Sequence, residues 1–297
     1  MTIYRAEQAC RSCGSEDLAP ILAFGEMPLA DRLLTADELA APDVTVPLTL
    51  VFCPACSLVQ IAETVEPEIL FGRDYPYFSS VSDTLLSHSR AHAEELIGRL
   101  GLDEGSLVVE IASNDGYMLR NFVEREIPVL GIDPAEAPAA AAVRAGVRTL
   151  NTFFGRELAA KLANDGQSAD LIIANNVLAH VADLNGLVTG IATLLKADGV
   201  AALEMPYLFD LLDKCEFDTI YHQHLCYFSV TALDRLFRGM ICAGSTFTAA
   251  RSASTSADTR PSPRQSATVW RRNRPGASAG STPTGRSRIG SRPCARS

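Results

Sequence analysis

The chain has 297 residues, 47% of them hydrophobic and 21% charged, with a formal net charge of −9. These values are typical of a globular protein with a buried core, and the acidic balance argues against nucleic acid as a partner. No apolar run of 18 residues and no signal pattern occurs, so we expect no membrane contact and a cytoplasmic location with reduced thiols.

Residues 1–72 are predicted to form a zinc-binding domain because they carry two C-x2-C motifs. Cys10 and Cys13 form the first motif, and Cys53 and Cys56 form the second. Two such turns can supply a tetrahedral shell of four thiolates for a structural Zn²⁺. Two disulfides or four unrelated thiols are the alternatives, and a reducing compartment disfavours disulfides.

The next segment contains "DYPYFSSVS" (74–82) and then a helical pattern with Asp83 as its expected N-cap. His88 and His92 lie four residues apart on this helix and could share a metal ion. No third ligand is evident nearby in the sequence, and the neighbouring charged residues favour a solvated surface pair.

From residue 107 onward, short apolar runs alternate with amphipathic stretches, which predicts a doubly wound, mostly parallel α/β sheet covered on both faces. The expected strands are 107–112, 128–132, 147–150, 170–174 and 199–204. The expected helices between them are 117–126, 135–145, 155–163 and 184–196.

The stretch "LVVEIASNDGYMLRNF" reads as strand, tight turn and helix, an arrangement that lets a ligand approach the backbone. Its turn lacks the G-x-G-x-x-G pattern of NAD-binding proteins and favours S-adenosylmethionine (SAM). Asp133 ends the next strand, where a carboxylate can accept hydrogen bonds from a ribose. A turn without any ligand is the alternative. The expected cofactor-binding residues are Glu110, Ala112, Ser113, Asn114, Asp115, Gly116, Asp133 and Asn175.

With these pieces in place, residues 10–238 resemble the sugar-nucleotide C-methyltransferases, which act on TDP-linked 4-keto-deoxysugars. The resemblance rests on the paired C-x2-C motifs followed by "DYPYFSSVS", "EIASNDGYML", "NNVLAHV", "EMPYLFDLL" and "FDTIYHQHLCYFS". Such enzymes have a zinc-binding domain, a SAM-binding Rossmann-like domain and a C-terminal α/β domain. This chain departs from the family pattern at Ala112, where glycine is usual, and at Gln223, where glutamate is usual.

The resemblance implies that "YHQHLCYF" (221–228) lies over the sugar and that His224 is the general base. A neutral imidazole suits removal of a proton next to a keto group, and a tyrosine hydroxyl can stabilise the oxyanion. The substrate partner would be a nucleotide sugar, and we expect a monomer. The expected catalytic residues are His224, Tyr221, His222, Gln223, His180, Asn176, Tyr75 and Tyr77.

Three alternatives remain open at this level. Read alone, the segment 221–228 could form a second zinc site from His222, His224 and Cys226, because alternate residues of an extended chain point the same way. The chain could also be a non-catalytic relative that binds SAM or a sugar nucleotide. A third possibility is an enzyme that methylates oxygen or nitrogen on another small molecule.

The composition changes sharply near residue 240. Residues 241–297 hold ten arginines, no lysine and one acidic residue, which gives +9 for this segment and −18 for residues 1–240. A disordered basic arm and an out-of-frame translation are the two interpretations, and we expect the second. The methyltransferase domain, 73–240, would then lack its last strands, and the chain would be poorly soluble or inactive.

Overall fold

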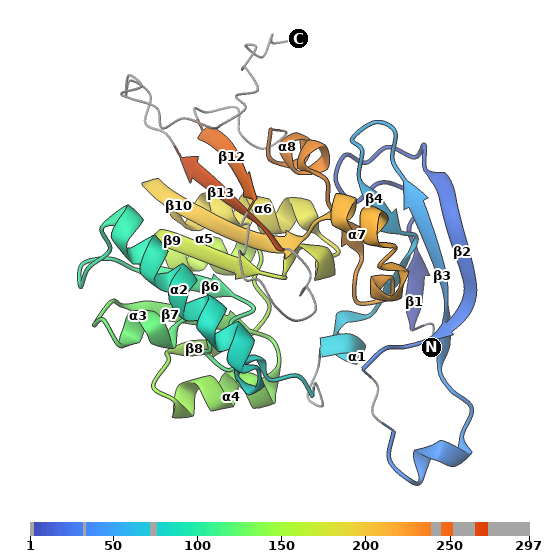
Figure 1. Ribbon diagram of the computed structural model, residues 1–297, viewed down its shortest axis with the longest axis horizontal. Helices are drawn as coiled ribbons and strands as arrows, with labels where there is room; N and C mark the ends of the chain where they lie inside the picture. The colour runs from blue at the N-terminus through green and yellow to red at the C-terminus, as the bar shows by residue number, and fades with distance from the viewer. Residues whose placement is uncertain (1–2, 32–33, 72–75, 239–244, 252–264, 273–297) are drawn as a thin grey trace.

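A seven-stranded sheet forms the centre of the computed structural model, which describes residues 3–31, 34–71, 76–238, 245–251 and 265–272. The strand order is β12-β13-β10-β9-β6-β7-β8 (Figure 1). Five neighbouring strands are parallel, which confirms the predicted doubly wound class. They are β6 (Val108–Ile111), β7 (Val129–Asp133), β8 (Thr149–Asn151), β9 (Ala169–Asn175) and β10 (Leu195–Pro206).

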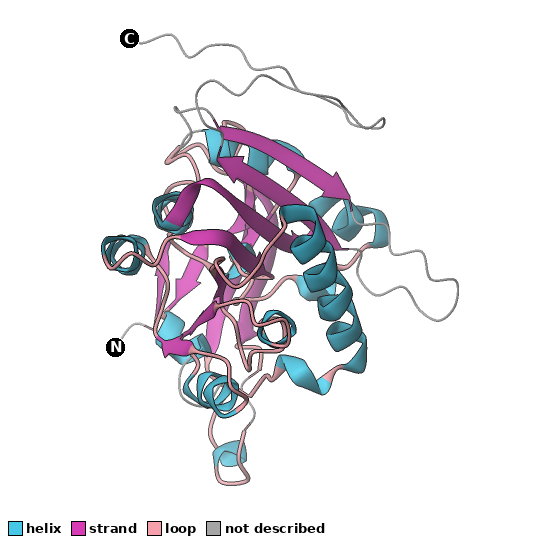
Figure 2. Ribbon diagram, turned by 90° about the vertical axis from the view of Figure 1, so that its left-hand side faces the viewer, coloured by secondary structure: helices cyan, strands magenta, loops and turns pink. Residues whose placement is uncertain are grey.

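The central strands are apolar on both faces because helices cover both faces of the sheet (Figure 2). Val108 and Leu171 pack beneath α2 (Asp83–Leu100), α3 (Arg120–Val123) and α4 (Glu136–Arg144). Val109 and Ile172 face the other side, towards α5 (Arg156–Asn164) and α6 (Leu184–Leu194). The alternation along each strand therefore divides the core into two layers.

Helix α2 begins one residue earlier than the sequence predicts. Its N-cap is Ser82, whose hydroxyl accepts a hydrogen bond from the Leu85 amide at 3.3 Å. Asp83 instead occupies the first turn, where its negative charge suits the helix dipole. The helix ends at Gly101, whose φ of 64° is favourable for glycine at this position.

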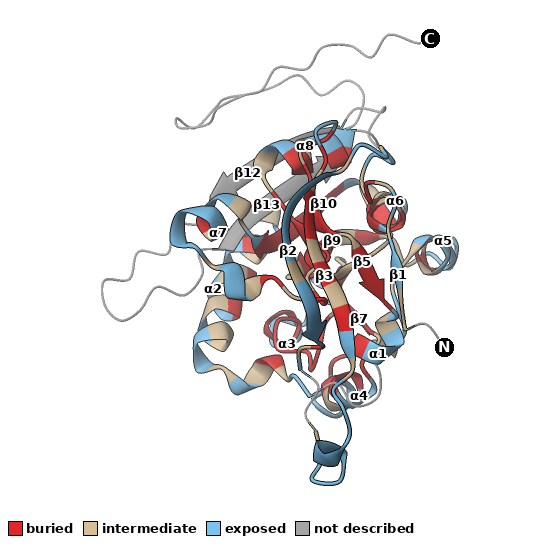
Figure 3. Ribbon diagram, turned by 90° about the vertical axis from the view of Figure 1, so that its right-hand side faces the viewer, coloured by how far each residue is buried: buried red, intermediate tan, exposed pale blue. Residues whose placement is uncertain are grey.

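The N-terminal residues form a second, four-stranded sheet of order β11-β4-β3-β2. Its members are β2 (Ala19–Pro28), β3 (Thr45–Phe52), β4 (Val59–Ile61) and β11 (Cys226–Tyr227). A two-stranded sheet of β1 (Tyr4–Ala6) and β5 (Glu63–Val65) and the short helix α1 (Pro67–Phe71) complete this part. Strand β2 is mostly exposed, whereas β7, β9 and most of β10 in the large sheet are buried (Figure 3).

Strand β11 comes from the segment 221–228, so a late part of the chain completes the N-terminal sheet. The two sheets also share one core, in which Leu58 and Val59 belong to the same cluster as Phe228 and Leu233. Phe228 lies two residues before α8 (Val230–Arg238). It forms an isolated β-bridge with Tyr207, the residue directly before α7 (Leu208–Lys214). The zinc-binding region thus packs directly against the segment expected to contain the base.

Two parts of residues 241–297, a segment that the sequence predicts to be disordered, form strands in the structure. Strands β12 (Ser245–Arg251) and β13 (Gln265–Arg272) extend the large sheet, and β13 pairs antiparallel with β10 from Val200 to Pro206. A continuous apolar run is typical of a central strand buried on both faces, and strands near a sheet edge do not need one. The remaining tail residues lie outside the described residues.

Candidate active site

The carboxyl ends of β6, β7, β9 and β10 meet at one edge of the sheet, where ligands of open α/β sheets bind. The turn after β6 has left-handed backbone at three positions, with φ values of 55° at Ala112, 49° at Asn114 and 80° at Gly116. A Cβ at Gly116 would lie 2.9 Å from Val147 Cγ2, so both φ and space require glycine there. The turn is therefore compact and brings its backbone close to the sheet.

Several buried polar atoms around this turn lack a hydrogen-bond partner among the described residues. They are both carboxylate oxygens of Glu110, the Ser113 hydroxyl, Asp115 Oδ1 and Asn175 Oδ1. Burial, with the charges of Asp133 and Asp115 nearby, raises the pKa of the Glu110 carboxyl well above its usual value. An unsatisfied set of acceptors next to acidic groups fits a ligand that brings donors and positive charge.

Asp133 ends β7 and organises the turn. One of its oxygens accepts from the Asn114 amide at 2.7 Å, and the other accepts from the Ala135 amide at 2.8 Å. Burial raises the pKa of this carboxyl, and the two amide hydrogen bonds oppose that rise. A carboxylate has about four acceptor sites, so Asp133 can still accept from ribose hydroxyls.

Asn114 and Asp115 use their side chains to hold the segment before α2. Asn114 Oδ1 accepts from the Ser79 amide at 2.8 Å, and Asn114 Nδ2 donates to the Tyr77 carbonyl at 3.1 Å. Asp115 Oδ2 accepts from the Ser80 amide at 3.1 Å. Part of "DYPYFSSVS" thus lies against the turn after β6. Tyr75 lies outside the described residues.

His224 forms a hydrogen-bonded pair with Tyr221. Its Nδ1 lies 2.7 Å from the Thr219 carbonyl oxygen, which can only accept, so Nδ1 carries the proton. Nε2 is therefore the basic nitrogen of the neutral ring, and it accepts from the Tyr221 hydroxyl at 3.1 Å. Burial lowers the pKa of His224 and raises the pKa of Tyr221 to about 12.

His180 lies beside this pair, on the 3₁₀ helix Leu178–His180 that follows β9. Its ring centroid is 4.9 Å from that of His224, and its Nδ1 donates to the Gln223 carbonyl at 2.8 Å. Burial, with His224 adjacent, lowers the pKa of His180 to about 3. Both imidazoles are thus neutral near neutral pH. Asn176 begins the same loop, with a φ of 56°.

His222, one of the expected catalytic residues, lies against the N-terminal sheet. It is 1% exposed, and its Nε2 lies 3.1 Å from the carbonyl oxygens of Val46 and Pro47 in β3. Its ring therefore points into the N-terminal sheet and not towards His224. Gln223 is also buried, at 3% exposure. A zinc site made of His222, His224 and Cys226 does not form among the described residues.

Comparison with known families identifies the two parts of the chain. Residues 85–240 match the family described as "Methyltransferase domain", and residues 10–71 match the family described as "Putative zinc binding domain". The chain belongs to the methyltransferase domain family. Together with the parallel sheet, the match identifies a SAM-dependent methyltransferase fold. The anionic surroundings of Glu110 fit that cofactor, which carries a sulfonium and an ammonium group, better than they fit a diphosphate.

A curated relative is the C-methyltransferase NovU of Streptomyces niveus, 36% identical over 235 residues. The match covers 79% of this chain and 56% of NovU, so the chain spans about half the length of this relative. The ubiquinone biosynthesis O-methyltransferase of Bartonella tribocorum is 28% identical over 94 residues, covering 31% of this chain and 38% of that protein.

Solved structures of methyltransferases are also similar. A SAM-dependent methyltransferase from Archaeoglobus fulgidus has 13% identity and a TM-score of 0.46, covering 62% of this chain and 94% of that chain. The plantazolicin methyltransferase BamL, solved with a desmethylPZN analogue and SAH, has 12% identity and a TM-score of 0.49, covering 65% of this chain and 87% of that chain.

The four cysteines of the methyltransferase's N-terminal part come together as predicted. Their sulfur atoms lie within 4.8 Å of one another, with 3.4 Å between Cys10 and Cys56 and 3.5 Å between Cys13 and Cys53. Zn–S bonds of about 2.3 Å suit a cluster of this size. In each C-x2-C turn the first cysteine's carbonyl accepts from the amide of a residue with positive φ, Gly14 or Ser57. The donor set fits a structural Zn²⁺ with no open position.

Sequence reasoning missed two residues near the methyltransferase site. Asp31 contributes a negative charge that opposes the lowering of the pKa of His224. Tyr117 is buried next to the charges of Glu110 and Glu204, and its hydroxyl hydrogen bonds Asn175. Asp31 lies far along the chain from His224, so no local pattern connects the two. The sequence shows Tyr117 as an aromatic residue directly after Gly116, but an aromatic residue in that place is equally typical of a buried core.

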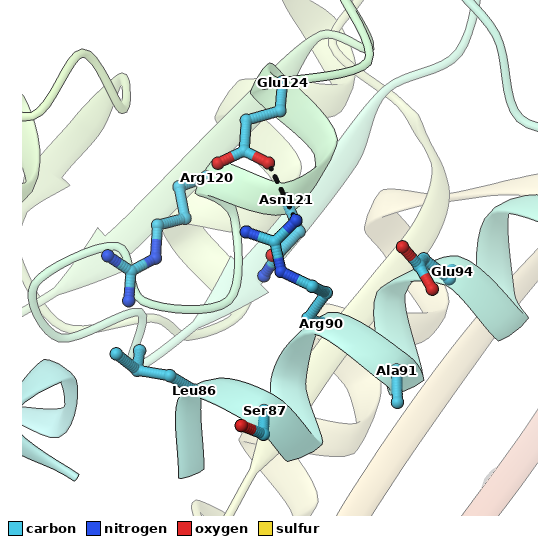
Figure 4. Close-up of a pocket in the computed structure, with 8 residues that line it drawn as sticks. All are labelled: Leu86, Ser87, Arg90, Ala91, Glu94, Arg120, Asn121 and Glu124. Atoms are coloured by element: carbon cyan, nitrogen blue, oxygen red, sulfur yellow. Dashed lines mark hydrogen bonds and ion pairs between the residues drawn. The ribbon is translucent and has the colours of Figure 1, made fainter. Parts of the chain in front are cut away.

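A pocket of about 390 Å³ lies between α2 and α3 (Figure 4), and its lining includes neither Tyr221 nor His224. It is lined by Leu86, Ser87, Arg90, Ala91, Glu94, Arg120, Asn121 and Glu124. Arg90 and Glu124 form an exposed ion pair across it at 3.3 Å. Exposed pairs of this kind contribute little stability.

None of the helices in the described part of the chain combines the length and hydropathy of a membrane span.

Proposed function

We propose that this protein is a SAM-dependent C-methyltransferase that acts on the carbon next to the keto group of a nucleotide-linked 4-keto-deoxysugar. The neutral His224, with Nε2 as its basic nitrogen and Tyr221 as its partner, carries the proposal. The similarity to the C-methyltransferase NovU supports carbon as the methylated atom. The proposed location is the cytoplasm, where thiols stay available to zinc.

His224 Nε2 would remove the proton α to the keto group. The sugar then becomes an enolate, whose oxygen needs a donor. The Tyr221 hydroxyl, 3.1 Å from the same nitrogen, would turn its proton from Nε2 to the sugar oxygen when the substrate binds, which also frees the Nε2 lone pair. A pKa of about 12 keeps that hydroxyl protonated. The Asp31 carboxylate favours the imidazolium that forms, while neutral His180 adds no opposing charge. The base and the oxyanion donor thus come from one four-residue segment.

SAM, when bound, supplies the electrophilic methyl group. Asp133 would hold the ribose, because it ends β7 and retains acceptor capacity beyond its two amide bonds. Glu110, Asp115 and Asn175 would accept from the donors of the methionine part, which satisfies oxygens that now lack partners among the described residues. Tyr77, whose carbonyl is fixed by Asn114, would close the pocket over both ligands.

The zinc-binding region would support the site without taking part in chemistry. Strand β11 pairs with β4, and the Leu225 carbonyl accepts from the Ile61 amide at 3.0 Å. Two positions before His224, His222 donates a hydrogen bond to the Val46 carbonyl in β3. These contacts hold the backbone on both sides of His224, which is how a structural zinc domain can determine the position of a base.

The test is incubation of the protein with SAM and a TDP-4-keto-6-deoxyhexose in D₂O. We expect a product with a new C-methyl group in its NMR spectrum. Without SAM, we expect deuterium at the carbon next to the keto group, because proton removal needs only the base. A methyl group on oxygen or nitrogen would contradict the proposal. Cofactor binding with neither exchange nor product would instead favour a non-catalytic relative.

A further inference from the structure

A second histidine cluster lies outside the proposed catalytic pair. His88 and His92 on α2 converge with Glu204 on β10, and their ligand atoms lie within 4.8 Å of one another. Glu204 Oε2 is 2.9 Å from His88 Nε2 and 3.9 Å from His92 Nδ1. The third member is 116 positions from His88, so the sequence alone favours an isolated surface pair.

The burial of these side chains differs from that of a solvated pair. The side chain of Glu204 is 3% exposed, that of His92 is 12% exposed and that of His88 is 40% exposed. A carboxylate buried to this degree needs a cationic or hydrogen-bonding partner. The cluster therefore extends from the core of the domain to its surface.

His92 shows that a hydrogen-bonded His–Glu pair does not complete the cluster. Its Nδ1 is buried and has no hydrogen-bond partner among the described residues, although it faces the Glu204 carboxylate. At 3.9 Å the contact is too long for a hydrogen bond. A buried nitrogen left in this way has lost its hydration without a replacement partner, which is unfavourable. A cation between the three side chains would satisfy it.

The donor set identifies the class of cation. Two histidines at positions i and i+4 of a helix lie on one face, and a carboxylate from a neighbouring strand supplies the third ligand. Imidazole and carboxylate together suit Zn²⁺ and related first-row divalent ions. Ca²⁺ and Mg²⁺ prefer shells made of oxygen alone.

We propose that His88, His92 and Glu204 form a second metal site, separate from the four cysteines, that binds one Zn²⁺ or a similar first-row divalent ion. Three protein ligands leave a coordination position for water, in contrast to the closed four-thiolate site. The partly exposed His88 gives the ion a route from solvent. The proposal does not depend on the function proposed above.

The location gives the site a structural consequence. Glu204 pairs with Asn175 across β9 and β10, and its carbonyl accepts from the Asn176 amide at 2.7 Å. A bound ion would therefore attach α2 to the carboxyl ends of these two strands, beside the proposed cofactor site. The N-terminal end of α2 follows the segment that Asn114 and Asp115 hold. The ion would hold α2, which follows this segment in the chain, against the sheet.

The experiment is a calorimetric titration of the full-length, reduced protein with Zn²⁺, after elemental analysis of the zinc already bound. Counting the zinc already bound together with the zinc taken up in the titration, we expect two equivalents per chain at saturation. His88→Ala should weaken one equivalent at least about tenfold, since even outer partners of metal ligands are worth 10–100-fold in affinity. Glu204→Gln should do the same. Glu94→Gln is the matched control, because Glu94 lies on the same helix but faces Arg125.

His88→Ala also guards against misfolding, because His88 is the most exposed of the three side chains. Its melting temperature without added zinc should match that of the wild type, while only the wild type should be stabilised by the second equivalent. Saturation of the wild type at one equivalent would overturn the proposal. A second equivalent that His88→Ala binds with unchanged affinity would overturn it as well.

Discussion

Ala112 has a φ of 55°, a left-handed conformation that an L residue with a Cβ adopts at a cost of about 1–2 kcal/mol. Glycine avoids this cost but loses more chain entropy on folding, by roughly 0.5–1 kcal/mol. We therefore predict that Ala112→Gly raises the free energy of unfolding by about 0.5–1 kcal/mol, or a few degrees in melting temperature.

Thermal unfolding of purified protein checks this prediction, with Ala139→Gly as the control. Ala139 is buried in α4, where glycine should destabilise by about 1 kcal/mol. Equal losses in both variants would mean that the turn after β6 is not strained. The departure from the family glycine at Ala112 would then need another explanation.

The pH dependence of turnover tests the role of His224. Burial lowers its pKa below the usual 6.5, so the imidazole is neutral and competent at neutral pH and is lost as a base only on acidification. We predict that kcat/KM rises with pH on the acid side, with a midpoint below pH 6.5, and is level at higher pH. Tyr221, with a pKa of about 12, should add no decline up to about pH 9.

Substitutions of His224 and Tyr221 separate the role of the base from that of the oxyanion donor. His224→Gln should lower kcat/KM by roughly 10²–10⁴-fold and remove the acid limb, the scale expected for a general base. Tyr221→Phe should lower the rate but keep that limb. An acid limb that persists in His224→Gln would assign the base to another group, for which neutral His180 is the nearest imidazole.

Individual residues show where sequence reasoning reaches its limit. The four cysteines were predicted correctly, because C-x2-C spacing fixes the geometry of each pair locally. His222 was expected at the catalytic site from the family resemblance, but its ring contacts β3, a contact that no local pattern of the segment shows. Glu204 was not found at all, since its partners lie on α2, more than 100 positions earlier in the chain.

At the scale of elements, apolar runs located the five parallel strands, because strands buried on both faces must be apolar throughout. Strands β12 and β13 were missed because their sequences, "STFTAAR" and "QSATVWRR", contain no such run. The strand β11 has only two residues, and its pairing with β4 depends on tertiary contacts that no local pattern encodes.

The pairing of β11 with β4 leads to a prediction about zinc. Removing the ion with a chelator under reducing conditions should loosen the turn that ends β3, and with it β4 and β11. We expect amide hydrogen exchange at 59–61 and 226–227 to speed up at least about tenfold, equivalent to about 1.4 kcal/mol of lost protection. Methyl transfer should fall as well, although no cysteine of the cluster would touch the substrate.

Exchange in β6 and β7 is the internal control, because these strands are buried between helices on both faces and contain no residue of either proposed metal site. Their protection should stay unchanged after chelation. Uniform loss across the molecule would mean that zinc stabilises the whole fold, and no change at 226–227 would mean that the cluster does not support the segment containing His224.

At the scale of the whole molecule, β13 covers an edge that would otherwise be open. The sequence-based expectation of an insoluble chain rested on an exposed β10, yet β10 pairs with β13 from Val200 to Pro206. The shared core of the two sheets also joins the zinc-binding region to the methyltransferase domain. That residues 241–297 are read out of frame stays a prediction, and the coding DNA across codon 240 tests it.

Truncation tests whether the tail completes the sheet. A chain ending at residue 240 would present the unpaired β10 edge, with amides and carbonyls free to pair with another copy. We predict that this chain aggregates in a concentration-dependent way in light scattering. A chain ending at residue 272 retains β12 and β13 and should behave like the full-length protein. If both truncated chains stay monodisperse, β13 does not protect the edge, and the sheet of this methyltransferase is stable without its last two strands.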